Sequence, residues 1–295
     1  MERYLEGSGP ASGEEARLSE NLRDLRLSTE VCEKVHCTFC ARREFFRRAA
    51  ARAYTLESGA QRFAICRYAP LERLVILCVL LTDVRTQYAS LRIPQDVYLD
   101  TISDIALHQR LYYETTGKLG LSMDDAQWLS HIFRMRIFKL GALQFQLAEM
   151  AYPSDPMRYD PAFMRQLPQG TPVLQIHIQR GADLSPLRVD DALQRARAFF
   201  SRYFPAHSHA ARAFVCCSWL LYPEMRRLLP PESNILHFSK RFTIIGTSDD
   251  GAGAIRRIYG KIYRRRSEYP QDTRLQRAAL GHFSMLGGAC GIIPI

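Results

Sequence analysis

The segment that most constrains the fold is Val173–Pro186, in which a short apolar run leads through a polar loop into a helix. The β-branched run Val173–Ile178 predicts a strand, and the cluster Gln179–Ser185 predicts a tight loop. Ser185 followed by Pro186 is typical of a helix N-cap and the first helical residue. A helix that begins after such a loop points unpaired N–H groups at it, which suits phosphate, although most helix N-termini bind nothing.

Apolar runs on both sides of this segment predict a mixed sheet with interspersed helices. The expected strands are a long one at Phe138–Met150 with a bulge or a close backbone approach at Gly141, Arg212–Cys217, a hairpin of Asn234–Phe238 and Phe242–Ile245, and an edge strand in Gly287–Ile295. The expected helices are a short one at Tyr222–Leu229, a basic one at Ala254–Arg266 and a last one at Thr273–Leu286.

The first half of the chain has apolar residues at helical spacing, which predicts a bundle of about five helices. Their expected positions are Glu14–Leu27, a helix capped by Ser28 or Thr29 that includes Val31 and Phe46, Pro70–Tyr88, a helix from Pro94, and Met123–Arg134 capped by Ser122. The run at residues 74–81 is strongly apolar, so we expect its helix to be buried on most sides. It is too short to cross a bilayer, which needs about 20 residues.

Composition indicates an ordinary globular protein with an arginine-rich, basic surface. The formal net charge is +10, and only five of the 40 basic residues are lysines. Arginine suits phosphate recognition, although a codon bias explains an even spread of arginine equally well. The small-residue-rich start at residues 1–13 is typical of a disordered leader rather than a secretion signal. Eight cysteines without such a signal favour a reducing cytoplasm.

The cluster Cys32, His36, Cys37 and Cys40 is the one candidate for metal binding. Residues four apart share a helix face, and Cys and His are zinc ligands. Structural zinc sites usually draw their ligands from two separate knuckles, and no second Cys-x-x-Cys occurs here. We therefore expect no metal, and interpret these thiols as small apolar side chains on a helix face.

Two polar side chains near predicted strand ends could carry chemistry. His177 shares a strand face with Val173 and Gln175 and lies near the end where ligands of α/β folds bind. Its titration range suits a general base that removes a proton from an amine, although a half-buried histidine bonded to backbone is the alternative. Ser218 follows the next strand without the surroundings of a nucleophile. Cys216 and Cys217 lie in an apolar run and are expected to be inert.

Several phrases of the sequence resemble those of a bacterial family that joins a helical N-acyltransferase N-terminal domain to a GNAT-like C-terminal domain. They are FKLGALQF at 138–145, IHIQRGADL at 176–184, CSWLLYPEMRRLLP at 217–230, SNILHF at 233–238 and DTRLQRA at 272–278. The likeness is good over Trp128–Ile295 and looser over the helical half. The predicted element order is also similar to the GNAT core.

This resemblance implies an α+β fold class, with an N-terminal helical bundle followed by a GNAT-like mixed-sheet α/β domain. The expected domains are a leader at 1–13, the helical N-acyltransferase domain at 14–135 and the GNAT-like domain at 136–295. It also implies a cytoplasmic acyltransferase that moves an acyl group directly from acetyl-CoA or another acyl-CoA to an amine. A small molecule or a peptide would carry that amine, and neither a membrane nor nucleic acid is expected as a partner.

By the same resemblance, the diphosphate of CoA would lie on the loop after the predicted strand at 173–178, and the pantetheine arm between that strand and the next. The residues implied for cofactor binding are Ile178, Gln179, Arg180, Gly181, Ala182 and Ser185. The loop has fewer glycines than is usual for GNAT proteins and contains Asp183. His177, Ser218 and Tyr222 are the candidate catalytic residues, with Tyr222 protonating the departing thiolate unless it only packs over the strand ends.

Two other functions stay open at this point. The sparse loop is compatible with a binding or regulatory module that kept the fold and lost the activity. The basic run Arg256–Arg266 is compatible with nucleic-acid binding, although a solvated helix face is the commoner meaning of such a run.

Overall fold

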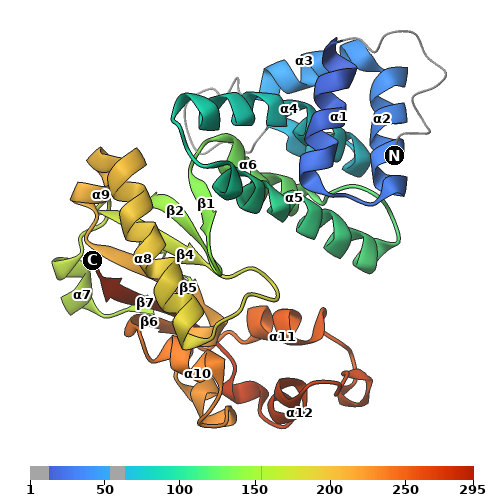
Figure 1. Ribbon diagram of the computed structural model, residues 1–295. Helices are drawn as coiled ribbons and strands as arrows, with labels where there is room; N and C mark the ends of the chain where they lie inside the picture. Colours follow the sequence, from blue (N-terminus) through green and yellow to red (C-terminus); the bar gives the residue numbers. More distant parts are fainter. Residues whose placement is uncertain (1–12, 54–63, 154) are drawn as a thin grey trace. The chain divides into compact units, whose positions relative to one another are not determined.

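The computed structural model describes residues 13–53, 64–153 and 155–295, which form two compact units, Met1–Phe138 and Lys139–Ile295 (Figure 1). Most of the predicted leader lies outside the described residues. The first unit is helical and the second is built on a mixed sheet. The predicted α+β fold class is therefore confirmed.

The helical unit is organised around its longest apolar helix, α4. The helices are α1 (Gly13–Leu25), α2 (Thr29–Ala41), α3 (Arg43–Ala53), α4 (Pro70–Ser90), α5 (Gln95–Thr116) and α6 (Met123–Phe133), with a 3-10 turn at Ala64–Arg67. Helix α4 packs against all five of the others, and Leu74, Leu77 and Leu81 on it are completely or almost completely buried. The prediction of a helix buried on most sides is confirmed.

Local side chains fix the starts of α2 and α6 in this unit. The Ser28 hydroxyl accepts a hydrogen bond from the Val31 amide at the start of α2. Ser122 and Asp125 form a reciprocal capping box at the start of α6. The apolar pattern from Val31 to Phe46 predicted one helix. The helix instead ends before Arg42, whose φ of −140° is not helical. Among the described helices, none is both long and apolar enough to cross a membrane.

The described residues form a sheet of seven strands in the order β1-β2-β4-β5-β7-β6-β3, of which β1 begins just before the sheet unit. They are β1 (Ile137–Leu140), β2 (Leu143–Glu149), β3 (Arg158–Tyr159), β4 (Pro172–His177), β5 (Ala213–Ser218), β6 (Thr243–Ser248) and β7 (Gly288–Pro294). Strands β4 and β5 run parallel, whereas β4 is antiparallel to β2, and β7 is antiparallel to both β5 and β6. Helix α8 (Pro186–Tyr203) makes the crossover from β4 to β5.

The remaining helices of this unit are short. They are α7 (Pro161–Gln166), α9 (Pro205–Ala210), α10 (Asn234–Ser239), α11 (Ala252–Tyr259) and α12 (Arg274–Leu280), with 3-10 turns at Trp219–Leu221, Glu224–Leu228, Arg266–Glu268 and Phe283–Met285. The short helix predicted at Tyr222–Leu229 is a 3-10 helix at Glu224–Leu228, and the separate turn at Trp219–Leu221 precedes it. The basic helix predicted at Ala254–Arg266 ends at Tyr259, and the last helix ends at Leu280.

Three strand predictions are wrong, for related reasons. The predicted long strand Phe138–Met150 is the hairpin β1–β2, and Gly141, with a φ of 68°, lies in its turn rather than in a bulge. Asn234–Phe238 forms helix α10, because a short apolar run does not distinguish a strand from a buried helix turn. The tail does form a strand, but β7 lies between β5 and β6 rather than at an edge.

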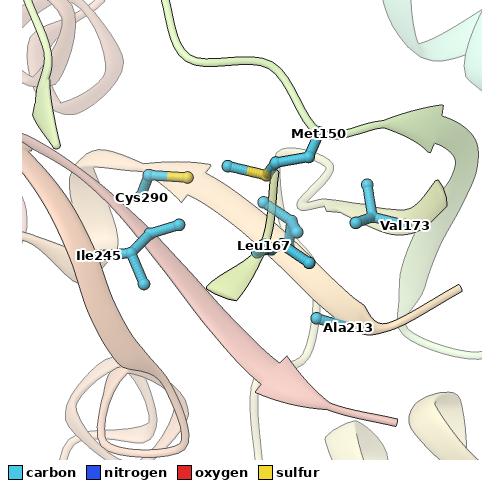
Figure 2. Close-up of a cluster of buried hydrophobic side chains, with 7 residues drawn as sticks. Met150, Leu167, Val173, Ala213, Ile245 and Cys290 are labelled. Carbon is cyan, nitrogen blue, oxygen red and sulfur yellow. The ribbon is translucent and has the colours of Figure 1, made fainter. Parts of the chain in front are cut away.

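The two faces of the sheet carry separate apolar layers. On one face Phe145 and Phe214 pack edge to face, 5.6 Å between ring centres, and Arg197 of α8 lies over the Phe214 ring. On the other face, Met150, Leu167, Val173, Ala213, Val215, Ile245 and Cys290 form a buried cluster. Figure 2 shows Cys290 within this cluster, beside Ile245 and Met150.

Candidate functional site

The site predicted after β4 lies where the parallel pair β4–β5 ends. The paired register of these strands consists of Leu174 with Phe214 and Gln175 with Val215. Both strands continue for two or three residues beyond this point, to His177 and Ser218. Over the same length, β5 remains paired with β7 and β4 with β2. The pairing therefore ends between two strands that are each held in place on their outer side.

His177 on β4 and Cys217 on β5 lie on opposite sides of the gap where the two strands are no longer paired. Gln175 and Val215 share a face as direct partners, and side chains two residues further along a strand return to that face. His177 is half-buried at the end of β4, and its Nε2 lies 2.8 Å from Gln146 Oε1 on β2. An amide oxygen only accepts hydrogen bonds, so Nε2 is the protonated nitrogen in this arrangement and Nδ1 the basic one.

The loop after β4 is closed by local hydrogen bonds. The Ala182 amide donates to the Gln179 carbonyl at 3.1 Å across a turn, and Gly181 has a φ of 82°. A positive φ at this position is typical of a type II turn and favours glycine. A side-chain carbon at Gly181 would meet open space. The glycine is therefore required by the backbone conformation and not by a crowded neighbour.

Asp183 does not turn away from the start of α8. Its carboxylate accepts a hydrogen bond from the Ser185 amide at 2.9 Å, and this bond lowers the pKa of the Asp183 carboxyl. Ser185 occupies the predicted N-cap position, but its side chain makes no capping hydrogen bond. Since Pro186 has no N–H, the amides of Leu187 and Arg188 are the first ones left in α8 for an anion.

A salt bridge anchors this helix start. Arg241, in the turn before β6, forms a bidentate pair with Asp190 and donates a further hydrogen bond to the Pro186 carbonyl at 3.2 Å. The pairing lowers the pKa of Asp190. The first turn of α8 is thereby fixed to the β6 side of the unit.

The other two candidate catalytic residues have structural contacts. Ser218 ends β5, and its hydroxyl accepts a hydrogen bond from the Leu220 amide at 3.2 Å. It points to the opposite face from Cys217, because adjacent strand residues alternate. Tyr222 is half-buried, and its ring lies so close to Gly287 that a side-chain carbon there would approach it to 2.7 Å. This contact is of the kind expected if Tyr222 only packs over the strand ends.

Cys217 is a feature that sequence reasoning missed. Its position in an apolar run predicted an inert thiol, and Cys216 is indeed buried, with burial raising its pKa. Cys217, however, is exposed, and hydrogen bonds from the Cys290 thiol and the Tyr159 hydroxyl lower its pKa. The available signals were the alternation of the strand and the position of Cys217 beside the strand end, since the partners come from distant segments.

The remaining sequence candidates do not assemble into sites in the part of the chain that is described. No three His, Cys, Asp or Glu residues there gather in a way that could hold a metal ion. Cys40 lies 3.8 Å from His36 Nδ1 on α2, and Cys32 donates toward the Leu27 carbonyl. Beyond Tyr259 the basic run is irregular, and Arg266 bonds the Leu280 carbonyl. The single basic helix face that supported nucleic-acid binding is absent.

Comparison with protein families gives two matches that divide the chain near the boundary of the two units. An N-acyltransferase N-terminal domain matches residues 16–135, and a GNAT-like C-terminal domain matches residues 137–293. The second match alone covers more than half of the chain. A comparison with curated proteins gives no match.

Solved structures of acyltransferases share the fold. One, in complex with decanoyl-CoA and teicoplanin, has a TM-score of 0.73 and 22% identity, covering 98% of this chain and 90% of that chain. Another, in complex with decanoyl-CoA, has a TM-score of 0.72 and 24% identity, covering 93% and 86%. A mutant in complex with octanoyl-CoA has a TM-score of 0.71 and 23% identity, covering 99% and 91%.

These findings confirm the resemblance found in the sequence. The chain belongs to the acyltransferase family that joins an N-acyltransferase N-terminal domain to a GNAT-like C-terminal domain.

Proposed function

We propose that this protein is an acyl-CoA-dependent N-acyltransferase that passes an acyl group directly from the CoA thioester to an amine. The observation that carries the proposal is the early end of the β4–β5 pairing beside the first turn of α8. Membership of the family supports it. So do the similar folds of acyltransferases that were crystallised with decanoyl-CoA and octanoyl-CoA.

In this proposal the CoA diphosphate lies at the loop and the first turn of α8. Backbone amides at a helix start attract anions, and the exposed side chains of Arg180 and Arg188 add positive charge. The proposed binding set is Ile178, Gln179, Arg180, Gly181, Ala182 and Ser185. Because Asp183 already accepts the Ser185 amide, we expect Ser185 to contribute less than the turn at Gly181.

The pantetheine arm then enters between the unpaired ends of β4 and β5, where its amides find backbone partners in place of the missing ladder bonds. The thioester carbonyl would lie beside the face that carries His177. The substrate amine attacks this carbonyl while His177 Nδ1 takes the amine proton, and the CoA thiolate leaves. Holding the two substrates together supplies most of the acceleration, and the base adds about 10²–10⁴-fold.

Tyr222 and Ser218 have lesser roles in the proposal. Tyr222 would protonate the departing thiolate, and Ser218 would bond the pantetheine or the substrate. Their contacts with Gly287 and with the Leu220 amide also serve packing. We therefore expect smaller losses of activity for Tyr222→Phe and Ser218→Ala than for His177→Ala.

The proposed acceptor is an amine on a small molecule or a peptide. One structural neighbour was crystallised with teicoplanin, so a glycopeptide amine is a reasonable first acceptor to test beside simple amines and peptides.

The test is calorimetry with octanoyl-CoA at up to millimolar concentration, followed by measurement of CoA release with a panel of amines. Binding with a one-to-one stoichiometry supports the proposal, and the absence of binding heat rejects it. Binding without turnover on any amine would instead identify the inactive binding module. Sequential rather than ping-pong kinetics are expected, since direct transfer forms no acyl-enzyme.

The residue test is His177→Ala, which should lower kcat/KM by about 10²–10⁴-fold while leaving octanoyl-CoA binding within a factor of a few. The matched control is His207→Ala. His207 is half-buried and bonds the Val173 carbonyl, so it contacts the opposite end of the same strand. Equal losses in the two variants would contradict a chemical role for His177.

A further inference from the structure

The pair Cys217 and Cys290 is used by neither the fold prediction nor the proposed chemistry. The two residues are direct partners on the antiparallel strands β5 and β7. Directly opposite residues of an antiparallel pair have their side chains on the same face. Cys290 is fully buried and Cys217 is exposed, so that one thiol is accessible and the other is shielded.

The register of β5 and β7 shows whether Cys217 and Cys290 form a hydrogen-bonded or a non-hydrogen-bonded pair. At the far end of the ladder the Ile295 amide donates to the Arg212 carbonyl. The next pair, Ala213 with Pro294, is not a hydrogen-bonded pair, because proline has no N–H. Alternation along the strands then makes Val215 with Ile292, and Cys217 with Cys290, non-hydrogen-bonded pairs too. Such pairs bring the Cα atoms to about 4.5 Å, within the range of a disulfide.

Tyr159 completes the arrangement from the neighbouring strands. It pairs with Gly246, and Gly246 pairs in turn with Cys290. A side-chain carbon at Gly246 would overlap the Tyr159 ring at 2.5 Å, so the absence of a side chain lets the ring lie over β6. The ring thus lies on the face that carries the two thiols, and hydrogen bonding from the Cys290 thiol and the Tyr159 hydroxyl lowers the pKa of Cys217. The same thiol pairing, followed by burial, raises the pKa of Cys290.

We propose that Cys217 and Cys290 form a redox-active dithiol that reacts with hydroperoxides, with Cys217 as the attacking thiol and Cys290 as the resolving thiol. An accessible thiol of thiolate character beside a second thiol is the usual arrangement of such sites. The proposal does not depend on acyl transfer, because it requires only the two strands and Tyr159.

The chemistry has two steps. The Cys217 sulfur attacks the O–O bond of the peroxide, forms an S–O bond as a sulfenic acid and releases an alcohol or water, so that sulfur is oxidised and the peroxide is reduced. The Cys290 sulfur then attacks the Cys217 sulfur, the S–S bond forms, the S–O bond breaks, and water leaves with the Cys290 proton. A dithiol reductant reverses the result by thiol–disulfide exchange.

The experiment treats the full chain with hydrogen peroxide, blocks remaining thiols and maps unreduced tryptic peptides by mass spectrometry. We expect a crosslink between the peptide at residues 213–226 and the one at residues 278–295, which dithiothreitol removes. Cys216→Ala should keep the crosslink, because Cys216 points to the other face. Cys217→Ser should abolish it.

Two further variants test the assigned roles. Cys290→Ser should leave a sulfenic acid on Cys217 that dimedone traps, and Tyr159→Phe should slow crosslinking several-fold. Cys37, exposed on α2, serves as the internal control and should be modified more slowly than Cys217. Failure of the wild-type chain to crosslink, or modification of Cys37 before Cys217, would overturn the proposal. An unchanged rate in Tyr159→Phe would remove Tyr159 from it.

Discussion

Helix α6 of the helical unit and helix α8 of the sheet unit differ in how far away in the sequence the residues that hold their starts lie. In the helical unit, α6 begins where Ser122 and Asp125 bond each other's backbone amides, within four residues. In the sheet unit, α8 begins without a side-chain cap and is held by Arg241, more than fifty residues away. Local chemistry therefore specifies the start of α6, whereas a distant partner holds the start of α8.

Strand positions depend on distant partners even more strongly. The final strand β7 pairs with β5 and β6, which come from separate parts of the chain. The centre of the helical unit, α4, is instead a continuous apolar helix that is recognisable in isolation. We therefore expect the two units to respond differently to changes at their centres.

The largest effect should come from deleting residues 288–295. The deletion leaves β5 and β6 without a shared neighbour. It also exposes the buried layer to which Cys290 contributes, so the sheet unit should lose its cooperative unfolding transition. Hydrogen exchange with peptide-level mass spectrometry should still find protected amides in α4. Ile295→Ala, at a half-exposed terminal residue, is the control and should change stability by less than about 0.5 kcal/mol. Retained protection in β5 would contradict the prediction.

Leu77→Ala should have the next largest effect. Leu77 lies on α4 and is fully buried, so its truncation should destabilise the helical unit by about 2–5 kcal/mol. Leu91→Ala removes the same atoms from a side chain that is 43% exposed and should have an effect below about 1 kcal/mol. Denaturant unfolding followed by circular dichroism measures both, and similar midpoints for the two variants would show that α4 is not the centre of the unit.

Gly291→Ala tests the centre of the sheet with a single methyl group. The added carbon would lie 2.8 Å from Phe242 Cβ. This atom is bonded directly to the backbone and cannot move aside as the end of a flexible side chain can, so we expect a loss of stability of about 1–3 kcal/mol. Gly253→Ala adds the same group in open space on α11 and should be neutral or stabilising by up to about 1 kcal/mol. Thermal unfolding compares the pair, and equal melting temperatures would argue against tight packing between β7 and Phe242.

The matched caps Ser122 and Ser185 compare the two units directly. Ser122→Ala removes a capping hydrogen bond at the start of α6 and should destabilise the helical unit by about 1 kcal/mol. Ser185→Ala removes no such bond, so a change of only a few tenths of a kcal/mol is expected. If the two variants lose the same stability in urea, local capping is not what distinguishes the helix starts.

The smallest effect is a pH dependence at Asp125. Although burial raises its pKa, hydrogen bonds from His108 and Ser122 lower it overall. A carboxyl with a depressed pKa in the folded state stabilises the fold above its unfolded value, about 3.9, and loses this contribution as pH falls through the folded value. The stability difference between wild type and Asp125→Asn should therefore be present at pH 6 and shrink below pH 4. It should stay below about 1 kcal/mol. A difference that grows on acidification would have the wrong sign.

The part of the candidate site that lies within one local segment was predictable. The strand β4, the loop with Gly181 and the start of α8 were placed from β-branched residues, a Gly/Asp/Ser/Pro cluster and the Ser-Pro pair. His177 was assigned to the correct strand end and face. The hairpin turn at Gly141 and helix α10 were missed, because a short apolar run fits a strand and a buried helix turn equally well.

The sequence by itself determined most helices of the first unit, the caps at Ser28 and Ser122 and the β4-loop-α8 segment, because helical hydrogen bonds join residues only four apart and leave a periodic pattern. Only the tertiary structure decided that β7 enters between β5 and β6, that the β4–β5 pairing ends early, and that Cys217 meets Cys290 and Tyr159. Strand hydrogen bonds use the same backbone groups in every strand, so the choice of partner depends on packing across the whole unit.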